Sequence, residues 1–101
     1  MQIVYEYVNI AASARLQELL EKKLNRLEEK YSDVIRADVF FKKENTKDDF
    51  GHICTIRLSL KGPQIVASSD EIDFEKSVLA TIDDLKDQLE RRKTKLKRKA
   101  I

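Results

Sequence analysis

The sequence predicts an α+β fold with the order β-α-β-β-β-α, in which an antiparallel-rich sheet carries two helices packed on one face. Two periodicities predict this class. Apolar and polar residues alternate with a period of two in 2–8, 36–43 and 52–60, as in half-buried strands, and a brief strand is expected at 64–68. Two longer segments repeat apolar residues with the period of amphipathic helices. Because there is no internal repeat and no low-complexity linker, we expect one domain over residues 1–101.

The first strand leads directly into the first helix. Ile3, Tyr5 and Tyr7 alternate with polar or smaller residues, which indicates a strand. Ser13 then offers the side-chain hydroxyl of an N-cap. The helix after it is expected to bury one apolar stripe, formed by Leu16, Leu20, Leu24, Leu27 and Tyr31.

Loop signals separate the next three strands. The polar segment 45–49 is expected to be a flexible loop, and Gly62-Pro63 a short turn into the strand at 64–68. In the strand before that loop, Phe40 is expected to point outward. The residues expected to face the core from the two longer strands are Ala37, Val39, Phe41, Cys54, Ile56, Leu58 and Leu60.

The last helix is expected to begin in an acidic segment and to end in a basic one. Asp70, Glu71, Asp73 and Glu75 crowd its expected start, where anions interact favourably with the helix dipole. Leu96 extends its apolar pattern by a further two turns. The main buried stripe is expected to be Phe74, Val78, Ile82, Leu85 and Leu89.

The composition argues against an enzyme, a metal site and a membrane protein. His52 and Cys54 are the single histidine and the single cysteine, and nothing near them in the sequence completes a zinc site or a catalytic dyad. A lone cysteine fits a reducing cytoplasm, and no apolar run approaches a membrane span. We therefore expect a cytoplasmic protein without catalytic residues, metal or other cofactor, small-molecule substrate or membrane association.

Charge is divided unevenly along the chain. Residues 1–89 carry 13 basic and 17 acidic residues, a net charge of −4, whereas residues 90–101 carry 7 and 1, a net charge of +6. Two or three cations would complement the negative end of a helix dipole. Seven cations repel one another unless a partner neutralises them, so the basic helix end at 90–101 indicates a polyanionic partner.

The first helix also separates its charges. At about 100° per residue, Lys23, Arg26 and Lys30 lie on one flank of the apolar stripe, and Lys22 lies further out on the same side. The acidic residues fall on the opposite flank. A solvated face with helpful i,i+4 pairs would mix the two signs, so this basic flank favours contact with a phosphate backbone.

The last helix adds basic stripes at the same spacing, and we expect its final turns to project beyond the domain. Two basic ridges on adjacent helices, with a groove between them, could hold a folded RNA through its phosphates without reading bases. The expected RNA-binding residues are Lys22, Lys23, Arg26, Lys30, Arg91, Arg92, Lys95, Arg98 and Lys99. Phe40 could stack on a base, but an outward Phe on an open sheet face is more often a stray apolar residue.

Several local strings, in this order and spacing, resemble the ribosome hibernation-promoting factor family, which includes the ribosome-associated inhibitor and is also known as the sigma-factor modulation protein family. The helical string at 20–28, LEKKLNRLE, is similar to the first helix of that family. The strings at 56–58 and 66–68 are similar to its third and fourth strands, and those at 71–78 and 82–89 to its second helix. The resemblance covers nearly the whole chain.

The resemblance implies a shape related to double-stranded-RNA-binding domains and binding to ribosomal RNA of the small ribosomal subunit. Such a protein would block the tRNA and mRNA sites and silence translation under stress or in stationary phase. The basic contacts of the family fall here on Lys23 and Arg26 of the first helix and on Arg91 and Lys95 of the second. Gln88 stands at a position that is basic in some members, so one contact is weaker, offset by Arg92.

Two other functions are compatible with the same features. One is a general double-stranded-RNA-binding module, which competition with tRNA and mRNA for empty small subunits would distinguish. The other is a protein-interaction regulator of a transcription factor, against which a strong salt dependence of binding would argue.

Overall fold

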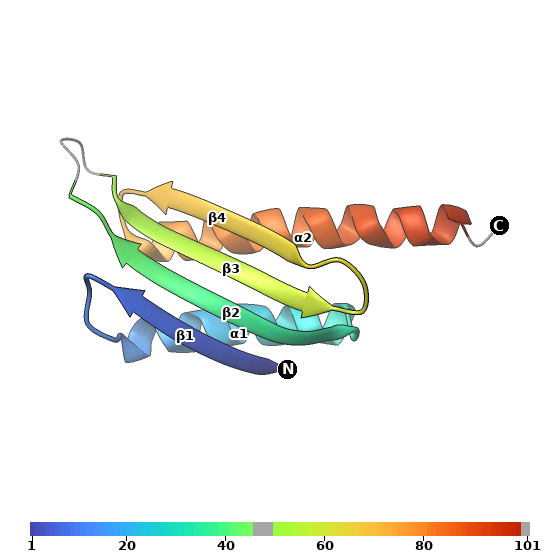
Figure 1. Cartoon of the computed structure of the whole chain (residues 1–101), viewed down its shortest axis with the longest axis horizontal. Coiled ribbons are helices and arrows are strands. Elements are labelled where there is room, and N and C mark those ends of the chain that lie inside the picture. Colours follow the sequence, from blue (N-terminus) through green and yellow to red (C-terminus); the bar gives the residue numbers. More distant parts are fainter. Residues whose placement is uncertain (46–49, 100–101) are drawn as a thin grey trace.

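The computed structural model describes residues 1–45 and 50–99, and side chains as far as Lys95. The predicted α+β class and element order are confirmed (Figure 1). The elements are β1 (Gln2–Val8), α1 (Ala14–Lys30), β2 (Val34–Lys43), β3 (His52–Leu60), β4 (Ile65–Glu71) and α2 (Phe74–Lys99). Residues 46–49 of the expected loop lie outside the described residues, as do the side chains of Leu96, Arg98 and Lys99.

The strands form one sheet in the order β1-β2-β3-β4. β1 and β2 are parallel because α1 connects them as a crossover, whereas β2, β3 and β4 pair antiparallel through short connections. Both helices lie on the same face of the sheet (Figure 1). The opposite face is not covered by any described element, so each strand has one buried and one open side.

The core lies between the sheet and the two helices, and the predicted inward residues fill it. Phe41 is fully buried and contacts aromatic rings from two other elements. Its ring lies 5.5 Å from that of Tyr7 in a stacked arrangement and 5.8 Å from that of Phe74 edge to face. Such pairs contribute about 0.5–1.5 kcal/mol beyond their burial. Phe41 therefore joins β1, β2 and the start of α2.

The start of α1 follows the prediction. Ser13 has an extended backbone, and its hydroxyl accepts a hydrogen bond from the Leu16 amide at 3.3 Å. The helix buries Leu20, Leu24 and Leu27 against the sheet. This burial fixes the rotation of α1 and thereby the direction in which its charged flanks point.

The expected acidic start of the last helix is right for Asp73, whose carboxylate accepts from the Lys76 amide at 2.7 Å, and for Glu75, but wrong for Asp70 and Glu71. Asp70 and Glu71 belong to β4, where they pair with Ile53 and His52 of β3. Asp70 also accepts a hydrogen bond from the Gly51 amide at 2.6 Å. Pairing with β3 thus extends β4 beyond 64–68, and the first turn of α2 keeps only Glu75 as an acidic residue.

Two buried hydroxyls fasten α2 to β3. The hydroxyl of Ser77 donates to the His52 carbonyl and accepts from the Glu71 amide. The hydroxyl of Thr81 donates to the Cys54 carbonyl at 3.1 Å and to the Ser77 carbonyl at 2.7 Å. Because a buried hydroxyl without a partner is costly, these bonds fix the position of α2 along the sheet.

Cys54 is expected to be chemically inert in the folded protein. It is fully buried, and burial raises the pKa of its thiol to about 12. Because the thiolate is the reactive form, an aromatic disulfide reagent at pH 8 should label the native protein at least ~100-fold more slowly than the urea-unfolded chain. Because the thiol pKa is higher in the folded than in the unfolded protein, the neutral thiol stabilises the fold below about pH 8.5. This stabilisation is lost as the pH rises from there toward the pKa of the folded protein. Rapid labelling of the native protein would contradict this prediction.

Candidate nucleic-acid interface

The basic flank of α1 is available to a partner. Lys22 and Arg26 are exposed, and Lys23 is half-buried beside the core. Over residues 1–45 and 50–99, none of these three side chains has an ion-pair partner. Three positive charges therefore face solvent from one side of one helix, without carboxylates that neutralise them.

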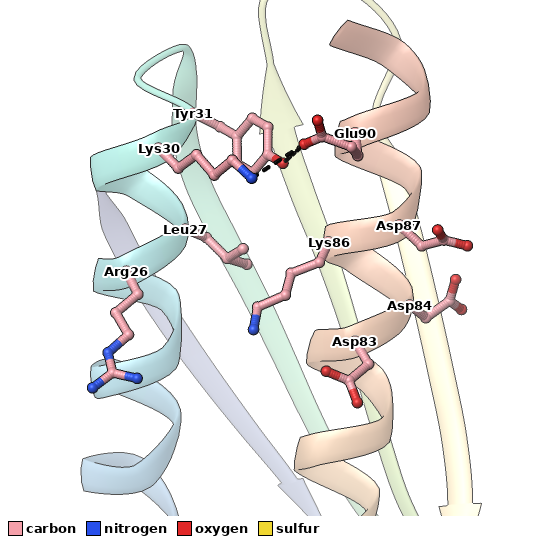
Figure 2. A pocket seen from close by; sticks show the side chains of 9 residues that line it. All are labelled: Arg26, Leu27, Lys30, Tyr31, Asp83, Asp84, Lys86, Asp87 and Glu90. Carbon is pink, nitrogen blue, oxygen red and sulfur yellow. Dashed lines mark hydrogen bonds and ion pairs between the residues drawn. The ribbon is translucent and has the colours of Figure 1, made fainter. Parts of the chain in front are cut away.

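An open groove of about 830 Å³ separates α1 from α2 (Figure 2). Its α1 wall is basic and its α2 wall is mainly acidic, with Lys86 as the cation of that wall. Lys86 and Glu90 point toward α1, whereas Asp84 and Asp87 point away from it (Figure 2). The residues that line the groove are Arg26, Leu27, Lys30, Tyr31, Asp83, Asp84, Lys86, Asp87 and Glu90.

The prediction that the groove lies between two basic ridges is therefore wrong for this groove, whose α2 wall is mainly acidic. Arg91 and Lys95 do not line it, because the side of α2 that borders the groove carries carboxylates until the helix passes Glu90. The spacing of the cations along α2 does not reveal that these acidic residues share the side that borders the groove. The basic surfaces are instead the flank of α1 and the far end of α2. Between them lies an acidic stretch of α2, formed by Asp83, Asp84, Asp87 and Glu90.

Lys30 contacts α2 instead of standing free. Its ammonium lies 3.3 Å from Oε2 of Glu90, and the hydroxyl of Tyr31 donates to the same carboxylate (Figure 2). These two contacts, first the tyrosine and then the lysine, lower the pKa of the Glu90 carboxyl. The hydrogen bond with Glu90 raises the pKa of Lys30. Lys30 thus joins the helices, and its charge is largely neutralised.

Arg92 also forms bonds with other parts of the fold. Its guanidinium donates to Oδ2 of Asp33 at 2.8 Å and to the carbonyl of Lys61. Arg91 differs, because it is 77% exposed and its one ion-pair partner among the described residues is Asp87, one turn earlier on the same helix. Lys95 is exposed and has no ion-pair partner in the described part of the chain. Arg98 and Lys99 are on α2, but their side chains are not among those that the structure describes.

The open sheet face contains a cluster that the sequence does not predict. Asp38 is 8% exposed and lies on this face. It accepts two hydrogen bonds from Arg36 at 2.9 and 3.0 Å and lies 3.7 Å from Arg57. Phe40 points outward as predicted, and the guanidinium of Arg57 lies 5.9 Å from its ring centre. The pairing of Asp38 with Arg57 depends on the β2–β3 register, which the sequence alone does not show.

The described residues show no metal-binding cluster, no His52–Cys54 dyad and no membrane-spanning helix. They contain no group of three or more His, Cys, Asp or Glu side chains that could hold a metal ion. His52 does not form a dyad with the buried Cys54, because its ring packs against Phe74 at 5.0 Å and its Nδ1 lies 3.3 Å from the Glu71 carbonyl. Within the described ranges, no helix has the length and apolar character needed to cross a membrane.

Two solved structures resemble this one over most of its length. A ribosomal subunit interface protein from Coxiella burnetii aligns with a TM-score of 0.80 and 26% sequence identity, covering 93% of this chain and 99% of its own. The N-terminal domain of Protein Y from Thermus thermophilus aligns with a TM-score of 0.76 and 22% identity, covering 90% of this chain and 98% of its own. At that identity, the second similarity shows the fold alone. Among curated proteins, none matches significantly.

The resemblance noted in the sequence is confirmed at the level of the family. Residues 3–97, nearly the whole chain, match the family described as sigma 54 modulation protein / S30EA ribosomal protein. The match spans all six elements of the fold. The chain belongs to the sigma 54 modulation protein / S30EA ribosomal protein family.

Proposed function

We propose that the protein is a ribosome hibernation factor of the cytoplasm, which binds the small ribosomal subunit through its ribosomal RNA. The observation that carries this proposal is a set of three cations on α1, Lys22, Lys23 and Arg26, which have no ion-pair partner among the described residues, on a chain of the S30EA family. The Coxiella structure, described as a ribosomal subunit interface protein, supports the same partner. Bound there, the protein silences translation in stress or stationary phase by occupying the tRNA and mRNA sites.

Two separate surfaces would make the contacts. Lys22, Lys23 and Arg26 form the first, and the exposed Arg91 and Lys95 at the end of α2 belong to the second. Lysine and arginine contacts to phosphates release condensed counterions, which supplies affinity without reading sequence. Inhibition by occupancy requires no catalytic group, and the protein would act through its volume and its position.

The acidic stretch of α2 restricts how RNA can approach. Phosphates that enter the groove between the helices would meet the carboxylates of Asp83 and Glu90 beside Lys86, and Asp84 and Asp87 add negative charge from the side of α2 that points away from α1. Like charges placed opposite each other oppose binding in that orientation. The RNA would therefore follow the outer flank of α1 and reach the end of α2 separately.

The family description also names sigma 54 modulation, which gives the protein-regulator alternative a specific basis. A direct protein contact and a phosphate contact respond differently to salt, because counterion release dominates the second. Pull-down of purified sigma 54, measured beside small-subunit binding over the same salt series, would distinguish the two functions. A general double-stranded-RNA-binding module would bind naked duplex RNA as tightly as it binds the empty subunit.

The first experiment reverses the free charges of the α1 flank. Lys23→Glu with Arg26→Glu should weaken small-subunit binding by at least about tenfold, because two phosphate contacts become repulsions. Co-sedimentation with purified subunits measures this, and circular dichroism checks the fold. The matched control is Glu18→Gln with Glu29→Gln on the outer side of α1 next to the basic residues, which should bind equally or more tightly because it removes two negative charges. Undiminished binding by a folded reversal variant would exclude this flank as the contact surface.

The second experiment measures the contribution of the α2 end. Arg91→Gln with Lys95→Gln should lower the slope of log affinity against log salt by roughly 0.7–0.9 for each phosphate that the variant no longer neutralises. The melting temperature should stay level, because glutamine keeps the helix propensity and both side chains are exposed. A slope equal to that of the unaltered protein would mean that these cations do not touch phosphates in the complex.

The third experiment neutralises the acidic stretch. Asp83→Asn with Asp84→Asn should tighten subunit binding severalfold at about 0.1 M salt, because two repulsive charges near the RNA path are removed. The increase in affinity should shrink as salt is raised. Weaker binding by this folded variant would show that the carboxylates contact cationic groups of the subunit, and the proposed path of the RNA would be wrong.

A further inference from the structure

The described side chains of α2 beyond Leu89 have little support from the core. Leu89 is the last buried apolar side chain of this helix in the described residues, and Arg91, Lys93 and Lys95 beyond it are exposed. The helix nevertheless continues to Lys99 and extends past the sheet (Figure 1). A helix end without packing frays easily and can change direction. Whatever fixes its base therefore decides where its cations lie.

Arg92 ties this base to two separate loops. Its Nη1 lies 2.8 Å from Oδ2 of Asp33, in the connection between α1 and β2. Its Nη2 donates to the carbonyl of Lys61, in the turn after β3. The Arg92 side chain is 23% exposed, against 77% for Arg91 beside it. Among the described residues, Arg92 is thus the last residue of α2 with a hydrogen bond or ion pair to another part of the fold.

The turn after β3 leaves room for this guanidinium. Gly62 has a φ of +103°, and a Cβ at this position would lie 3.2 Å from Nη2 of Arg92. A side chain here would require a backbone conformation that L-residues rarely adopt and would crowd the arginine. Gly62 therefore contributes both the turn and the space in which Arg92 reaches the Lys61 carbonyl.

We infer that Arg92 is a positioning residue and not a phosphate contact. Its clamp to Asp33 and Lys61 holds the base of the α2 end, so that Arg91 and Lys95 face the RNA before binding. The rigid fork of a guanidinium suits two simultaneous acceptors, and the Asp33 carboxylate already neutralises its charge. A surface that is ordered before binding avoids the cost of ordering it in the complex. This inference rests on the proposed function and names how one part of its site is held.

A pair of single substitutions separates positioning from electrostatics. Asp33→Asn and Asp87→Asn each remove a carboxylate that pairs with an arginine of α2. The arginine is Arg92 in the first case and Arg91 in the second. Electrostatics alone predicts that both variants bind a polyanion equally or more tightly. Positioning predicts that Asp33→Asn weakens small-subunit binding by roughly tenfold, although it removes a negative charge, whereas Asp87→Asn does not weaken it.

The salt dependence gives a second readout that a decrease in stability would not change. Arg92→Gln should weaken binding at every salt concentration with an unchanged slope, because the bound protein still makes the same phosphate contacts. If Arg92 itself contacts a phosphate, the slope falls by about 0.7–0.9. Affinities are measured on protein that circular dichroism shows to be fully folded.

The free protein tests the clamp directly. Spin labels at Asn25→Cys and Thr94→Cys, in a Cys54→Ala background, report the distance between α1 and the α2 end by pulsed electron paramagnetic resonance. The distribution should broaden with Asp33→Asn and with Gly62→Ala, a change that leaves the charge unaltered, and should stay narrow with Asp87→Asn. An unbroadened distribution together with tighter binding of Asp33→Asn would overturn the inference. If the unaltered protein fails to bind small subunits, the proposed function fails, while the label distances still decide whether Arg92 orients the helix.

Discussion

Both helices bury their apolar stripes against the same face of one sheet, and this constraint organises the charged surfaces of the two helices. α1 lies on that face because it connects the parallel strands β1 and β2. α2 is held there by the hydroxyls of its residues Ser77 and Thr81, which donate hydrogen bonds to backbone carbonyls of β3. With one side of each helix buried, charged residues are left to the flanks and the outer side. The basic flank of α1 and the acidic stretch of α2 are therefore consequences of how the core fixes the rotation of each helix.

The same constraint makes α2 depend on polar contacts where it leaves the sheet. Apolar burial on α2 ends at Leu89 in the described residues, and the ion pairs follow directly. Glu90 meets Lys30 and Tyr31 of α1, and Arg92 meets Asp33 and the Lys61 carbonyl. Exposed ion pairs contribute little to the free energy of unfolding, so their main effect here is on geometry. They connect the last supported turn of α2 to α1 and to two loops.

The sequence was sufficient for the fold because its elements follow clear periodicities. Phe41, Ile56 and Leu85 were assigned to the core from spacing alone, and all three are fully buried. The end of β4 was placed too early because Asp70 and Glu71 are poor strand formers in isolation, and only pairing with β3 keeps them in the sheet. That pairing is a tertiary effect which a local pattern does not contain.

The candidate site was less predictable, since charge counts say nothing about which partner a side chain finds. Lys30 and Arg92 carry the same kind of charge as Arg26 and Arg91, yet both are engaged within the fold. Their partners, Glu90 and Asp33, are 60 and 59 positions away in the sequence. For Lys22, Lys23 and Arg26 the local sequence was more informative, because the helix period alone places them on one flank of α1, where Lys22 and Arg26 are exposed and Lys23 is half-buried. Their contact with RNA remains a prediction.

The acidic residues between the two basic surfaces make the charge pattern selective. A uniformly basic protein would attract any polyanion in any orientation, because the electrostatic term alone carries no geometric information. Here the cations of α1 and those at the end of α2 are separated by the carboxylates that border the groove. A polyanion can satisfy both basic surfaces only if its phosphates are spaced to pass around that stretch. A folded RNA with fixed phosphate positions meets this condition more readily than a flexible single strand, which must give up conformational entropy to follow the same path. Under the proposed function, this surface would select a folded RNA by shape, which the net charge of +2 does not reveal.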